Sequence, residues 1–71
     1  MDISLIGTHA GAVWNMLHEK GGMDLTQLKK ETKLTDKEIV VAIGWLAREG
    51  KVLSEEVKKG RKTVELFSLA D

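Results

Sequence analysis

The 71-residue sequence has no cysteine, no proline and no tyrosine, and it contains a single phenylalanine. The lack of cysteine excludes disulfide bonds and thiolate metal sites. An excess of charge of either sign is also lacking, because eleven basic residues balance eleven acidic ones and the formal net charge is zero. Domains that wrap nucleic acid usually carry a basic excess. This charge balance therefore counts against a protein whose main work is to wrap nucleic acid.

Long apolar runs are absent as well, so no segment is expected to span a membrane. The first residues, Met1–Ser4, lack the basic start and apolar core of a signal peptide, and we expect a cytoplasmic protein. What the chain does have is a globular balance of 42% hydrophobic and 31% charged residues. Its length suits one small core, so we predict a single domain over residues 1–71.

The first predicted helix runs from Thr8 to Lys20. Its apolar residues follow the i, i+3, i+4, i+7 spacing of one helix face, and they are Ala10, Val13, Trp14 and Leu17. Thr8 is the expected N-cap, and Gly21-Gly22 is expected to end the helix. The apolar residues before it, Ile3, Leu5 and Ile6, fit either a strand or an early turn.

Two further helices are predicted from capping boxes. Asp24 and Gln27 have this spacing before a helix over 25–32, and Thr35 and Glu38 have it before a third helix that Gly50 ends. The third helix carries a second apolar stripe, made of Ile39, Ala42, Ile43 and Leu46. The residues of 51–57 and 63–69 favour β-structure, and the turn Lys58–Lys62 centred on Gly60 predicts that they form a hairpin.

Three helices followed by a hairpin resemble a winged helix-turn-helix domain, from about Gly7 to Leu69. The residues that carry the resemblance are Leu25-Thr26-Gln27-Leu28, Leu34-Thr35 and Leu46–Val52. The expected fold is therefore α+β and mostly helical, with a C-terminal two-stranded wing. The stretches Ile6–Gly11 and Ile43–Glu49 also resemble a small bacterial winged-helix family of unassigned function. That resemblance implies a DNA-binding role without a known ligand.

Catalytic groups do not gather in the predicted helices. His9 and His18 lie on opposite sides of one helix, because nine positions at about 100° each turn the direction by half a circle. Gly7 and Gly11 lack the lysine and serine that end a phosphate-binding loop, and local backbone fit explains them better. We therefore predict a protein that is not an enzyme, holds no cofactor or metal and takes no small-molecule substrate.

The resemblance places the third helix in the DNA major groove and the wing on the backbone or minor groove. The groove-facing positions would be Asp36, Lys37, Val40, Val41, Gly44, Trp45 and Arg48. Only Lys37 and Arg48 among them are residue types that read bases, so sequence-specific recognition is not expected.

The wing turn offers a different DNA contact. Lys58, Lys59, Arg61 and Lys62 are four cations that reach phosphates in such a position. The alternative is a solvated turn whose lysines protect a strand edge. Glu55 and Glu56 are expected to neutralise part of this cluster, whereas Lys29, Lys30 and Lys33 either extend a basic side or form an ordinary hydrated helix face.

The apolar residues outside the core stripes suggest an interface. Candidates for it are Val40, Val41, Trp45, Phe67 and Leu69, with Leu53 beside them. The alternative is that Trp45 folds onto its own chain. The leading hypothesis is a non-catalytic winged-helix domain that contacts DNA weakly through its wing. The alternative is a protein-interaction or homodimerisation module that uses the apolar face of the third helix without binding DNA. We expect a homodimer through this face, and a dimer can also present its wings to DNA.

Overall fold

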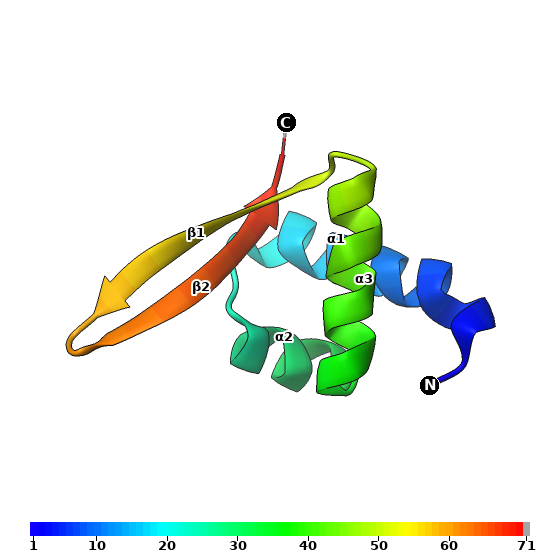
Figure 1. Ribbon diagram of the computed structural model, residues 1–71, viewed down its shortest axis with the longest axis horizontal. Helices are drawn as coiled ribbons and strands as arrows, with labels where there is room; N and C mark the ends of the chain where they lie inside the picture. The colour runs from blue at the N-terminus through cyan, green and yellow to red at the C-terminus, as the bar shows by residue number, and fades with distance from the viewer. Residues whose placement is uncertain (71) are drawn as a thin grey trace.

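A computed structural model describes residues 1–70 and has three helices followed by an antiparallel hairpin (Figure 1). After a short 3-10 turn over Ile3–Leu5, the elements are α1 (Ile6–Lys20), α2 (Leu25–Thr32), α3 (Asp36–Arg48), β1 (Val52–Lys59) and β2 (Lys62–Leu69). Figure 1 shows α3 crossing α1, with α2 beside the start of α3 and the hairpin extending away from the helices. This arrangement confirms the predicted winged helix-turn-helix fold.

The start of α1 differs from the prediction. The helix begins at Ile6 and Leu5 is its N-cap, so Thr8 lies inside the helix and caps nothing. Of the two alternatives for the residues before it, the early turn is confirmed, because Ile3–Leu5 form a 3-10 turn. The Asp2 carboxylate accepts hydrogen bonds from both the amide and the hydroxyl of Ser4 at its start. This 3-10 turn runs directly into α1, and its Ile3 carbonyl accepts from the amide of Ile6, the first residue of α1. A hydroxyl cap at Thr8 is therefore unnecessary.

Both predicted capping boxes are confirmed. The Asp24 carboxylate accepts from the Gln27 amide at 2.8 Å, and the Gln27 side chain accepts from the Asp24 amide at 3.0 Å. The Thr35 hydroxyl and the Glu38 carboxylate make the same reciprocal pair at 3.2 and 2.9 Å. These contacts satisfy free backbone amides and so define where α2 and α3 begin.

The core lies between the three helices and the base of the hairpin. Its buried members are Ala10, Val13, Leu17, Met23, Leu28, Ile39, Ala42 and Leu46. The two predicted helix stripes therefore face inward, with Ile43 and Trp14 at the margin of the core. The Trp14 ring also stacks on His18, with 4.9 Å between ring centroids.

The hairpin has a shorter turn than predicted. Lys59 pairs with Lys62, so Gly60 and Arg61 alone connect the strands. Gly60 has φ +63° and stands first in this two-residue turn, as a type II′ turn requires. At the base, the backbones of Met23 and Phe67 exchange hydrogen bonds of 2.9 and 2.8 Å, which fastens the wing to the segment between α1 and α2.

Candidate nucleic-acid interface

The tip of the wing gathers the four cations that the sequence placed there. Lys58, Lys59 and Lys62 end the two strands and Arg61 lies in the turn, and all four are exposed. Within residues 1–70, none of the four lies within ion-pair distance of a carboxylate. The expected neutralisation by Glu55 and Glu56 is not seen in these contacts, and Glu56 faces Glu65 across the hairpin.

The outward face of α3 presents little that reads bases. Lys37 and Arg48 lie about 16 Å apart along the helix axis, at 1.5 Å per residue. The side chains between them are apolar or absent, with Val40 56% and Trp45 47% exposed, Val41 half-buried and Gly44 bare. Near the start of α3, Asp36 forms an ion pair with Lys29 of α2, with 2.8 Å between Asp36 Oδ1 and Lys29 Nζ. Lys29 is thereby partly neutralised and adds less to the basic side that the sequence suggested.

Trp45 is shared between its own chain and solvent. One edge of its ring lies against α1, since a Cβ built on Gly7 would stand 3.8 Å from Trp45 Cζ2. A shallow hollow of about 310 Å³ runs beside it, lined among others by Gly7, Gly11 and Trp14. Small residues on α1 thus leave room for the indole, while nearly half of it stays exposed. The contact with Gly7 favours the alternative that Trp45 packs on its own chain, and the interface at Trp45 stays a prediction.

The other apolar candidates divide between the core and the surface. Phe67 and Leu69 pack against the core cluster from the base of β2, so much of their surface is already used within the chain. Leu53 of β1 is 59% exposed, and Val40 of α3 is 56% exposed. Of the predicted interface residues, Val40 and Trp45 are exposed to solvent and Val41 is half-buried beside them on α3.

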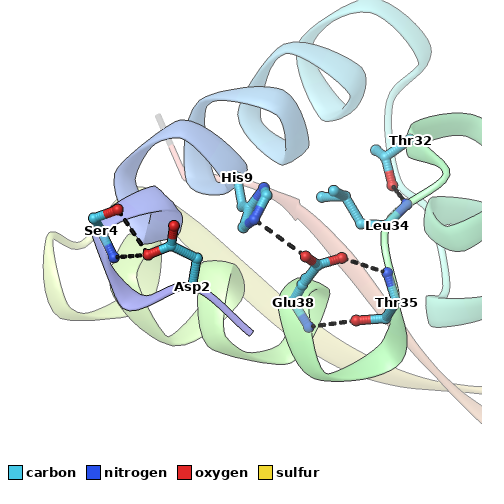
Figure 2. A network of polar contacts seen from close by, with 7 residues as sticks. All are labelled: Asp2, Ser4, His9, Thr32, Leu34, Thr35 and Glu38. Carbon is cyan, nitrogen blue, oxygen red and sulfur yellow. Dashed lines mark hydrogen bonds and ion pairs between the residues drawn. The ribbon is translucent and has the colours of Figure 1, made fainter.

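A polar network joins α1 to the start of α3 and was not foreseen from the sequence (Figure 2). His9 Nε2 lies 3.3 Å from Glu38 Oε2, and the same carboxylate accepts from the Thr35 amide. This backbone hydrogen bond from Thr35 lowers the pKa of Glu38, and hydrogen bonds from Ser4 lower the pKa of Asp2. The capping role of Glu38 was readable from spacing, but its contact with His9 depends on how the helices cross.

Other kinds of site receive no support from residues 1–70. No three His, Asp or Glu side chains in this part of the chain come together as metal ligands. The described helices include none that combines the length and the apolar character needed to cross a bilayer.

The fold and the projecting basic tip define the class: a winged helix-turn-helix domain. The family described as "Winged helix-turn-helix domain (DUF2582)" matches residues 1–66, and the chain belongs to this family. A relative of known structure is protein BT2368 from Bacteroides thetaiotaomicron, determined by solution NMR. It is 36% identical with a TM-score of 0.73, and the match covers 96% of this chain and 79% of that one.

A more distant likeness shows the fold alone. Stf76 from the Sulfolobus islandicus plasmid-virus pSSVx superposes with a TM-score of 0.80 at 15% identity, over 86% of this chain and 79% of that chain. No curated protein matches the chain significantly.

Proposed function

We propose that the chain binds the sugar–phosphate backbone of duplex DNA through the tip of its wing, weakly and with little sequence preference. The observation that carries this proposal is the group of four exposed cations at the end of a projecting hairpin, none of them paired with a carboxylate among residues 1–70. Cations held in this way can each contact a phosphate and release a counterion.

The outward face of α3 explains why sequence preference should be low. Direct readout needs donors and acceptors at the base edges, and here the middle of the face offers Val40, Val41 and Gly44. The zero net charge of the chain limits long-range attraction. The proposed role is therefore that of a DNA-associated domain without catalysis.

Fluorescence anisotropy with a labelled random duplex at low salt tests the proposal. Four phosphate contacts predict a slope of log affinity against log salt of roughly −3 to −4. Replacing Lys58, Lys59, Arg61 and Lys62 together with alanine should flatten that slope and abolish most of the binding.

The matched control removes four positive charges elsewhere, through alanine at Lys20, Lys29, Lys30 and Lys51. It changes the net charge by the same amount and leaves the wing intact, so it should keep most of the slope. Equal losses in both variants would overturn the wing as the contact surface. Absence of binding in wild type at low salt, or tight sequence-selective binding, would overturn the proposal itself.

A second candidate function rests on the exposed apolar side chains of α3. Val40 and Trp45 remain 56% and 47% exposed on one helix, which favours contact with another protein or a second copy. Trp45→Glu should leave the circular dichroism spectrum intact, because nearly half of Trp45 is exposed and it is not among the buried core residues. If this surface makes a homodimer, the variant should halve the mass measured by sedimentation. Unfolding of Trp45→Glu would instead assign Trp45 to the chain's own packing.

A further inference from the structure

The outer edge of β1 has no strand beside it within residues 1–70. β1 pairs with β2 on one side alone, over all eight of its residues. Alternate residues of an edge strand turn their backbone N–H and C=O groups outward, where another strand can pair with them. Figure 1 shows this edge running along a hairpin that extends beyond the helices, so a second chain can approach it.

The charged residues along this edge are acidic on one side of Val57 and basic on the other. Glu55 and Glu56 precede Val57, and Lys58 and Lys59 follow it. Positions at equal distance from Val57 therefore carry opposite charges. Edge lysines usually prevent pairing, but here an antiparallel copy of the same strand would offer each lysine a carboxylate.

We propose that two copies of the chain join edge to edge along β1, antiparallel, with Val57 on the twofold axis. The two hairpins then form one four-stranded sheet. Glu56 of each copy faces Lys58 of the partner subunit, and Glu55 faces Lys59 of the partner subunit. The partner is a second copy of this chain because the charge pattern is complementary to itself.

Symmetry selects this register among its neighbours. A twofold axis that joins antiparallel edges stands perpendicular to the sheet, so one residue of β1 must face its own copy. Shifting the axis to Glu56 would place two carboxylates opposite each other, and shifting it to Lys58 would place two ammonium groups together. With the axis at Val57, every charged residue from Glu55 to Lys59 meets the opposite charge.

The apolar side of the hairpin supports the same register. Val57 pairs with Val64 across the hairpin, and both are half-buried. Pairing at Val57 places the two copies of this residue next to each other, flanked by the two copies of Val64. A row of four valines then forms on one face of the joined sheet, where neighbouring strands bury apolar surface together.

This surface differs from the α3 face and goes beyond the proposed DNA contact, although Lys58 and Lys59 belong to both. Sedimentation equilibrium from about 10 µM to about 1 mM is the first test. Wild type should dimerise in this range. Glu56→Lys and Lys58→Glu should each raise the dimer dissociation constant at least about tenfold, because each sets like charges opposite one another twice in the dimer.

Mixing the two single variants is the decisive measurement. Glu56→Lys leaves lysine at both positions 56 and 58, and Lys58→Glu leaves glutamate at both. Position 56 of one variant then faces position 58 of the other with the opposite charge, so an equimolar mixture should form a heterodimer with affinity close to that of wild type. Glu19→Lys, which makes the same charge change on the exposed surface of α1, is the matched control and should stay dimeric. Failure of the mixture to associate would overturn the register.

Engineered cysteines locate the axis in a chain that has none of its own. Facing residues of antiparallel strands have Cα atoms about 4.5–5.5 Å apart, within reach of a disulfide. Val57→Cys should therefore cross-link to its own copy in oxidised glutathione, whereas Ser54→Cys should not, because its two copies would lie about 20 Å apart. A monomeric wild type at about 1 mM, or a dimer broken by Trp45→Glu and unaffected by Glu56→Lys, would overturn the proposal.

Discussion

Gly11 lies inside α1, and a Cβ added to it would meet no atom within 4 Å. Glycine in a helix interior costs about 0.5–1 kcal/mol relative to alanine. Gly11→Ala should therefore raise the free energy of unfolding by about that amount, and urea denaturation followed by circular dichroism measures it.

Gly21→Ala is the opposing control for this substitution. Gly21 ends α1 with φ +81°, a conformation that alanine adopts only at a cost. This variant should be less stable than wild type. If both variants shift stability in the same direction, backbone conformation does not explain the effect of either one.

The carboxylate of Glu38 makes stability depend on acid pH. Its pKa is lowered in the folded chain, first by the hydrogen bond from the Thr35 amide, so the unfolded chain binds the proton more readily. The resulting stability is fully present above the ordinary glutamate pKa of about 4.3 and is lost as pH falls below it. Glu38→Gln should lose less stability than wild type between neutral and acid pH, in urea titrations at each pH. An unchanged acid dependence would point to other carboxylates, Asp2 among them.

At the scale of elements, two threonines make a direct comparison of helix starts. Thr35 caps α3 through its hydroxyl, whereas Thr8 lies within α1 and caps nothing. Thr35→Ala should cost about 1 kcal/mol, and Thr8→Ala should change stability by a few tenths at most. Thermal unfolding of the two variants checks the difference. A larger loss at Thr8 would mean that α1 begins where the sequence pattern suggested.

The elements predictable from sequence are those fixed by neighbours along the chain. The starts of α2 and α3 follow from capping boxes, in which Asp24 and Thr35 each pair with a residue three positions later. The face of α3 that packs inward follows from the helical spacing of its apolar residues. The start of α1 was predicted wrongly because Thr8 has the residue type of a cap, whereas Asp2 and Ser4 build a 3-10 turn ahead of it. Residue type alone cannot distinguish these possibilities.

The contacts of the candidate sites divide in the same way. The sequence placed the four cations at the end of the wing, since a hairpin turn brings its flanking residues together. It could not place Trp45 against Gly7 or His9 beside Glu38, because both contacts depend on the crossing of α1 and α3. The opposite charges on the two sides of Val57 are visible in the sequence. They predict pairing with a second copy only once β1 is known to be an edge strand.

At the scale of the whole molecule, the two proposed contacts compete. Lys58 and Lys59 contact phosphates in the proposed DNA complex and carboxylates of the partner subunit in the proposed β1 dimer. Adding excess random duplex at low salt should therefore convert dimer to DNA-bound monomer, and DNA affinity should fall as protein concentration rises. Sedimentation with absorbance at two wavelengths follows both components. A dimer that binds duplex without dissociating would contradict this competition.

The fastening of β2 to the segment before α2 has a consequence for synthesis on the ribosome. Phe67 and Leu69 cover the core, and the Phe67 backbone bonds to Met23, which is translated long before it. While residues 62–69 remain in the exit tunnel, Phe67 and Leu69 cannot cover the core, and that side of any helix that has emerged stays open to water. Such distant pairing is slow to form and leaves apolar surface exposed in the meantime. The nascent helices must therefore wait for the wing, and this domain completes its folding only after β2 has left the tunnel.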